Sequence, residues 1–220
     1  MDGVIAKTAA ILATVIAVGV VSVNLIPLTM WMPVMVVSGL ATIIFPLVAA
    51  FRHSMGPVFA ILYGAVEGLF LGVISQIFEL QYPGIVMQAV LGTFCAAGVT
   101  LGAFHFGGFR ANGKFSRIIR LSIMGFAAVA LVSFILSLFG INLGFYAGLT
   151  GTVGGLAWIW AGVGVVLAVF SLVDDFTVIE RGVNMRAPAK QGWVAAWGLA
   201  VTLVWLYTQI LRILSYVNRR

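Results

Sequence analysis

The chain has 220 residues, of which 62% are hydrophobic and only 8% are charged. Soluble domains carry about 25% charged residues, so this composition excludes an ordinary soluble fold with a polar surface. The mean hydropathy of +1.16 predicts an all-α integral membrane protein. In such a protein the net charge of +6 indicates topology rather than binding to nucleic acid.

Seven transmembrane helices are predicted, because about 20 apolar residues cross the hydrocarbon core. Pro27 and Pro33 divide an uncharged run at 8–51, and a glycine-rich turn at 140–144 divides a second uncharged run at 121–173. The predicted spans are, in chain order, about 9–26, 32–51 (ending at Arg52 and His53), 57–78, 85–106, 118–139, 150–173 and 192–215. We expect one transmembrane domain that covers 1–220.

Basic residues are distributed unevenly over the predicted loops. The opposing loops at 27–31, 79–84 and 140–149 contain neither Lys nor Arg. The positive-inside rule therefore predicts a multi-pass protein of the plasma membrane with a cytoplasmic N-terminus and an outside C-terminus. The alternative is a last segment that does not cross. Nine basic residues lie on the predicted cytoplasmic side: Lys7, Arg52, Arg110, Lys114, Arg117, Arg120, Arg181, Arg186 and Lys190.

Glu67 is the one charged residue of the third predicted span. An ionised carboxylate at mid-bilayer costs about 2.5–3.5 kcal/mol on insertion scales, so we expect Glu67 to be neutral at rest or hydrated by a cavity. Gly64, Gly68 and Gly72 recur every four residues beside it, a stripe that predicts close packing by another helix. Glu67 is interpreted as a proton or cation site; the alternative is a protonated carboxyl that only packs helices together.

Asp174 and Asp175 open a charged segment that extends to Gln191 and is predicted to be a loop. Adjacent helical residues point about 100° apart, so at most one of the two aspartates is expected to face the bundle. The alternative is a solvated helix end. Glu180 is expected to be a loop residue that pairs loosely with Arg181.

A second group of charges lies before the fifth predicted span. Arg110, Lys114, Arg117 and Arg120, if helical, form one basic stripe that fits anionic lipid headgroups, although a plain topology signal is the simpler interpretation. No His-Glu-x-x-His, Gly-x-Ser-x-Gly or paired-cysteine motif occurs. We therefore expect no enzyme activity and no cofactor, and we assign no metal ligands.

Four segments together resemble the Bax inhibitor-1/YccA-like membrane proteins, including one bacterial branch of that family. They are, in the family's order, 63–72 (YGAVEGLFLG), 82–93 (YPGIVMQAVLGT), 175–180 (DFTVIE) and 201–212 (VTLVWLYTQILR). The resemblance implies a seven-helix bundle with a central last helix, an inside N-terminus and an outside C-terminus. It also implies either a pH-sensitive calcium leak or modulation of a membrane-bound protease.

The resemblance also implies roles for individual residues. Calcium-leak members have two aspartates that form a latch, and Asp175 matches the first of them. Thr202 stands where the second is expected, and Gln209 stands where the bacterial branch often has Glu. The leading hypothesis is thus a passive leak of calcium or protons that uses Glu67, Asp175, Asp174, Thr202 and Gln209. The alternative is a membrane adaptor for a protease or another membrane complex; the short segment before the first span favours transport.

Overall fold

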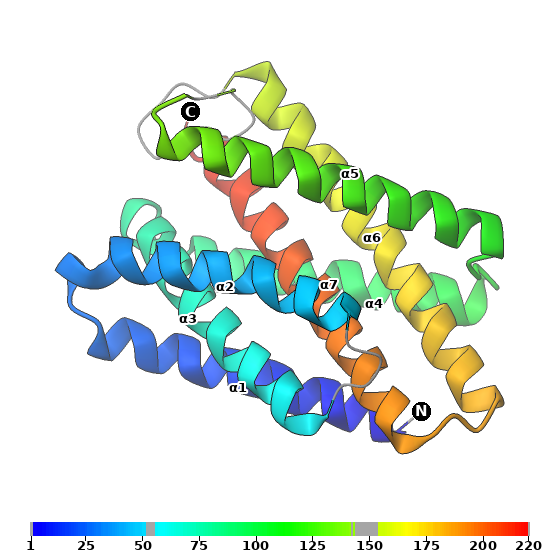
Figure 1. Cartoon of the computed structure of the whole chain (residues 1–220). Helices are drawn as coiled ribbons and strands as arrows, with labels where there is room; N and C mark the ends of the chain where they lie inside the picture. The colour runs from blue at the N-terminus through cyan, green and yellow to red at the C-terminus, as the bar shows by residue number, and fades with distance from the viewer. Residues whose placement is uncertain (1, 52–55, 142, 144–153, 220) are drawn as a thin grey trace. The chain divides into compact units, whose positions relative to one another are not determined.

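A computed structural model describes the chain except for residues 1, 52–55, 142, 144–153 and 220. The described residues form α-helices and one 3-10 turn, and they contain no strand (Figure 1). The elements are α1 (Asp2–Leu25), η1 (Leu28–Met30), α2 (Trp31–Phe51), α3 (Pro57–Gln81), α4 (Ile85–Phe106), α5 (Gly113–Leu138), α6 (Gly155–Asn184) and α7 (Ala189–Val217).

Six of these helices, all except α2, are long and apolar enough to cross a membrane. The apolar part of α2 within the described residues, Trp31–Pro46, is shorter than a span. The chain is therefore a multi-pass membrane protein, whereas the seventh crossing and the central last helix remain predictions. The expected end of the second span at Arg52 and His53 lies outside the described residues. So do the first residues of the sixth predicted span, 150–153.

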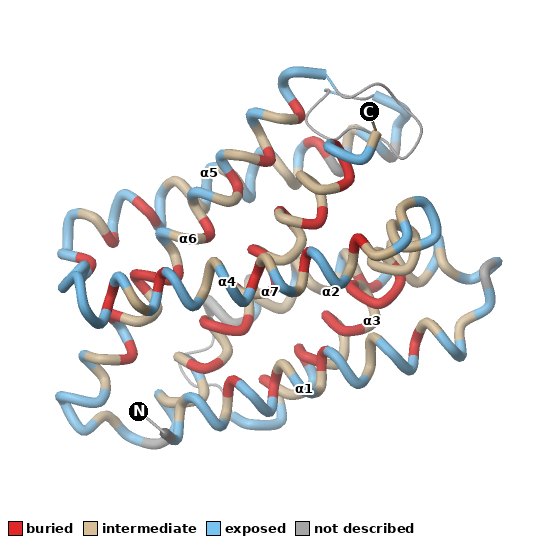
Figure 2. The backbone as a smooth tube through the Cα atoms, turned by 180° about the vertical axis from the view of Figure 1, so that it is seen from behind, coloured by how far each residue is buried: buried red, intermediate tan, exposed pale blue. Residues whose placement is uncertain are grey.

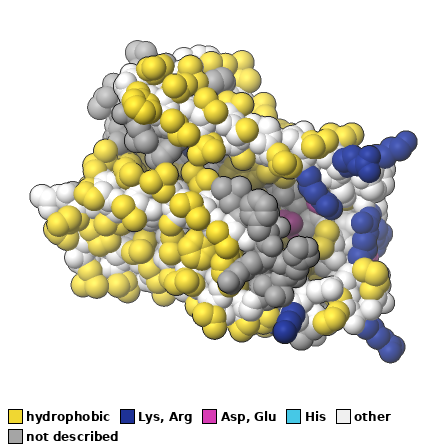
Figure 3. All heavy atoms as spheres, in the orientation of Figure 1, with side chains coloured by type: hydrophobic (Ala, Val, Ile, Leu, Met, Phe, Trp, Pro, Cys, Tyr) yellow, Lys and Arg dark blue, Asp and Glu magenta, His cyan; other side chains and the backbone are white. Residues whose placement is uncertain are grey.

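Exposed side chains agree with a lipid environment. Val58 and Phe94 are 79% and 63% exposed, in helices that could cross a membrane. Figure 3 shows hydrophobic side chains over much of the visible face of the molecule. In water such a surface would promote aggregation, whereas lipid tails solvate it.

Helix α6 corrects one prediction, because residues 174–184 continue the helix instead of forming a loop. Glu180 is therefore helical as well. Buried side chains continue past the aspartates at Thr177 and Ile179, and this packing overrides the local charge. The helix ends in a Schellman motif, in which Ala187 N–H donates to the Gly182 carbonyl and Arg186 N–H to the Val183 carbonyl.

The chain divides into two compact units, and each has its own packing. The first unit comprises residues 1–86 and 178–201, and the second comprises 87–177 and 202–220. In the first unit, α1 and α3 lie side by side, and buried residues concentrate on α3 while much of α1 is exposed (Figures 1 and 2). In the second unit, the Phe126 ring of α5 stacks on Trp160 of α6 at 4.0 Å and contacts Trp205 of α7 at 5.5 Å.

Candidate functional site

The glycine stripe of α3 lies directly against the backbone of α1. A Cβ atom added to Gly68 would lie 2.6 Å from the Val15 carbonyl oxygen, and one added to Gly64 would lie 3.1 Å from the Ile11 carbonyl oxygen. One added to Gly72 would lie 2.6 Å from the Gly19 carbonyl oxygen. Side chains larger than hydrogen would hold the two helices apart. This approach fixes the face of α3 on which Glu67 lies.

Glu67 is buried within the first unit, with 6% of the residue exposed. Its carboxyl is hydrogen-bonded to the hydroxyl of Tyr63, one turn earlier on the same helix. Its other oxygen, Oε2, has no hydrogen-bond partner among the described residues. A buried carboxyl oxygen without a partner is unfavourable unless water, a proton or a cation satisfies it.

Tyr63 is itself held in place by aromatic rings. It is 3% exposed, and its ring lies 5.5 Å from Trp197 of α7 in an edge-to-face arrangement and 6.0 Å from Phe45 of α2. No Lys, Arg or His occurs in α3 or α2, or in 8–25 and 191–201 of α1 and α7. The helical segments packed around Glu67 in the first unit therefore supply no counter-charge, so a mobile cation or a proton is the natural partner.

In the second unit, Asp174 connects α6 to the beginning of α5. It is 8% exposed, and its Oδ1 accepts a hydrogen bond of 2.5 Å from the Ser116 hydroxyl. Its Oδ2 accepts a charged hydrogen bond of 3.3 Å from Nε of Arg120. Asp174 is thus satisfied on both oxygens.

Asp175 faces α7 rather than α5. It accepts a hydrogen bond from the Thr202 hydroxyl, which lies 3.3 Å from the Ser171 hydroxyl. Its buried Oδ2 has no partner among the described residues. The expectation that only one aspartate faces the protein is therefore wrong, because α5 and α7 flank α6 and receive one side chain each.

The predicted basic stripe is also corrected. Asn112 caps α5 by accepting the Phe115 N–H at 2.8 Å, so the helix begins at Gly113 and Arg110 lies before it. The Arg110 guanidinium instead lies 5.5 Å from the centre of the Phe104 ring. Lys114, Arg117 and Arg120 remain helical and exposed, and Arg120 reaches Asp174.

Gln209 is buried in α7, where its amide packs against Gly164 of α6. Its side-chain oxygen accepts a hydrogen bond of 3.2 Å from Nη1 of Arg212. An oxygen that already accepts from a guanidinium is a poor cation ligand. Thr202 is the better candidate for a cation ligand, because its hydroxyl lies beside the Asp175 carboxylate.

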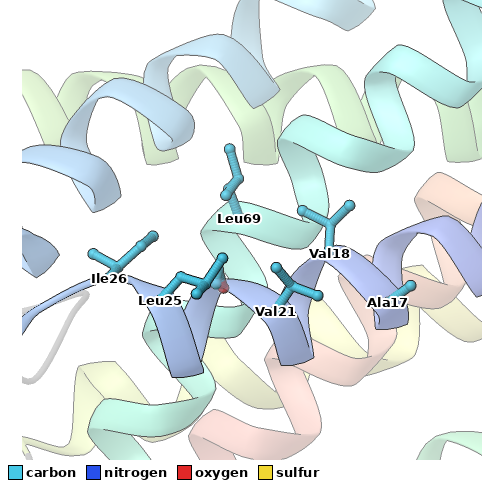
Figure 4. A pocket seen from close by; sticks show the side chains of 7 residues that line it. Ala17, Val18, Val21, Leu25, Ile26 and Leu69 are labelled. Carbon is cyan, nitrogen blue, oxygen red and sulfur yellow. The ribbon is translucent and has the colours of Figure 1, made fainter.

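An apolar groove of about 270 Å³ lies on the first unit (Figure 4). Most of its lining is hydrocarbon, from α1 side chains between Ala17 and Leu25, from Ile26 after α1 and from Leu69 of α3. Its one polar side chain is Ser22, whose hydroxyl donates to the Gly19 carbonyl at 2.8 Å, so the groove offers no charged group for an ion. In the described part of the chain, moreover, no three His, Cys, Asp or Glu side chains come together as a metal site.

Sequence reasoning missed Tyr63 and Ser116 as partners of the acids. The contact between Tyr63 and Glu67 could have been predicted, because residues four apart lie on the same face of a helix. Ser116 had none, since it lies 58 residues from Asp174.

Comparison with known families agrees with this architecture. The family described as Bax inhibitor 1 like matches residues 1–219, which is essentially the whole chain. No curated protein and no solved structure matches the sequence. The chain is therefore a multi-pass membrane protein that belongs to the Bax inhibitor 1 like family.

Proposed function

We propose that this protein provides a passive pathway for cations, either calcium ions or protons, across the plasma membrane. The observation that carries the proposal is Glu67, a buried carboxyl in an apolar helix whose Oε2 lacks a partner among the described residues. Acidic side chains at membrane depth mark ion or proton pathways by default. The family match supports a membrane protein of the Bax inhibitor 1 like family, and its description names no transport activity.

The chemistry of Glu67 favours weak and transient binding. Calcium takes six to eight oxygen ligands in a stable protein site. Glu67 offers one carboxyl, shared with the Tyr63 hydroxyl, so a divalent cation would keep most of its water there. A leak requires such weak binding, because an ion held tightly would not be released.

Asp175 supplies a second carboxylate, which we treat as a separate step of the same pathway. Its Oδ2 and the Thr202 hydroxyl are oxygen ligands at the charged end of α6. By the positive-inside rule this end is cytoplasmic, so Asp175 would meet ions at the inner face. Gln209 drops out of the ligand set because it accepts from Arg212.

Purified protein in liposomes tests the proposal. Vesicles loaded with a calcium-sensitive or a pH-sensitive dye should show flux that empty liposomes lack, and the two dyes separate calcium from protons. Asp175→Asn should reduce the flux or change its pH dependence more than Asp174→Asn, because both oxygens of Asp174 already have partners. Absence of flux with both dyes would reject the pathway.

The alternative from sequence, an adaptor for a membrane-bound protease or another complex, predicts a different result. An adaptor would give no calcium or proton flux in liposomes, and it would change the activity of its partner when both are reconstituted together. In addition, Glu67→Gln would leave that effect unchanged.

A further inference from the structure

The acidic residues of the second unit form a single pair with one attached cation. Asp174 and Asp175 are the only acids within 87–177 and 202–220. Arg120 joins them from α5, with its Nε 3.3 Å from the Asp174 carboxylate. Counted as ionised groups, the two aspartates and Arg120 carry a net charge of about −1 rather than −2.

Arg120 is one of two partners from α5 that bind Asp174. The Ser116 hydroxyl already connects α5 to Asp174 through a bond of 2.5 Å. The Arg120 side chain is 62% exposed, whereas the Asp174 side chain is 11% exposed. Arg120 therefore brings a charge from the surface to a carboxylate that is otherwise held by a neutral partner.

That charge acts on the neighbouring residue as well. Asp175 keeps one oxygen without a partner among the described residues, next to the Thr202 hydroxyl. A cation that approaches this oxygen meets the field of Asp175, Asp174 and Arg120 together. Neutralisation of Asp174 by Arg120 removes about half of the attraction for a divalent ion.

We propose that Arg120 is a selectivity-determining residue that keeps divalent cation binding at the Asp174–Asp175 pair weak. This inference rests on the proposed cation pathway, and it states that the charge of one arginine sets the affinity of that pathway for divalent cations. Without Arg120 the pair would carry a charge of −2 and would hold a calcium ion more tightly. Tighter binding slows release, so the same arginine keeps the pathway from being blocked by calcium.

Four proteins with three charge states test the proposal by calcium titration of the purified protein. The probe is Ca²⁺ alone, measured by calorimetry with the full chain in nanodiscs of neutral phosphatidylcholine, at pH 8 and constant ionic strength. The two aspartates and residue 120 together carry a charge of −1 in the wild type, −2 in Arg120→Gln and 0 in Asp174→Asn. The double variant, which combines Arg120→Gln with Asp174→Asn, returns to −1. Arg117→Gln is the matched control, since Arg117 is an exposed arginine three residues earlier on α5.

The expected order of calcium affinity follows charge alone. Arg120→Gln should bind about tenfold more tightly than the wild type, the effect of one unit charge on a divalent ion several ångströms away in a water-like medium. Asp174→Asn should bind more weakly than the wild type. The double variant, Arg120→Lys and Arg117→Gln should all resemble the wild type. Arg120→Met is a second neutral variant, should Arg120→Gln not fold.

A purely structural role for Arg120 would give another pattern. The double variant would then be at least as impaired as the single ones, and no variant would gain affinity. Either result, or absence of calcium binding in every neutral variant of Arg120, overturns the inference.

Flux assays distinguish a failure of this inference from a failure of the proposed function. Calcium affinity that follows charge in a protein without flux rejects only the pathway. Flux in a protein whose calcium affinity does not follow charge rejects only the role of Arg120.

Discussion

The close approach of α1 and α3 makes Gly68→Ala a sharp test of the packing beside Glu67. The new Cβ would lie 2.6 Å from the Val15 carbonyl oxygen and 3.0 Å from the Val18 Cβ. Ordinary contacts begin near 3.4 Å, and the closest atom belongs to the backbone, so α1 must shift by roughly 1 Å. Overpacking of this kind costs about 1–3 kcal/mol.

A matched substitution isolates this effect from helix propensity. Alanine gains about 0.5–1 kcal/mol over glycine in a helix. Gly98→Ala on α4 should show that gain alone. Apart from its chain neighbours and the nearby backbone of α4, no described heavy atom lies within 4 Å of the new Cβ. Gly68→Ala should therefore lose up to about 2.5 kcal/mol overall, while Gly98→Ala is stabilised. The measurement is thermal unfolding of the purified protein in detergent, monitored by circular dichroism. Equal stability of the two variants would refute the close contact.

Three further predictions test the helix ends and the topology. Arg186→Gly should stabilise the protein by about 1 kcal/mol in the same unfolding assay, because Arg186 has φ 49° at the end of α6, where glycine has no Cβ penalty; a loss would contradict the Schellman geometry. Glu79→Ala should destabilise by about 1–2 kcal/mol, and Glu79→Gln by less, because the two Glu79 oxygens accept the N–H groups of Gly84 and Val86 at the start of α4; unchanged stability would argue against the cap. Reporter fusions should place 107–117 in the cytoplasm and the C-terminus outside, and a cytoplasmic C-terminus would reject the seven-span arrangement.

The helices were predictable because their signals are local. Pro57 begins α3 and the glycine at 140 follows the end of α5, in agreement with the general preferences of these residues at helix ends. The prediction failed after Asp174, where a dense run of charges suggested a loop. That part of α6 is helical because Thr177 and Ile179 remain buried, a tertiary effect that charge counting does not detect.

The site was predictable only in part, for the same physical reason. Glu67 is conspicuous as a lone charge in an apolar span, and Tyr63 lies on its face by helical spacing. The pairing of Arg120 with Asp174 joins residues 54 positions apart, so no local pattern contains it. The sequence placed Arg120 in a basic stripe, either as a topology signal or as a site for anionic headgroups, and the fold also pairs this exposed arginine with a carboxylate.

Flux through Glu67→Gln in liposomes tests the central claim most directly. The substitution keeps the size of the side chain and an acceptor for the Tyr63 hydroxyl, and it removes the titratable proton and the negative charge. Glu180→Gln serves as the control for a loss of charge elsewhere. We predict that Glu67→Gln unfolds at the same temperature as the wild type and that its calcium or proton flux is abolished or loses its pH dependence. A folded Glu67→Gln protein with unchanged flux and unchanged pH dependence would contradict a cation pathway through Glu67.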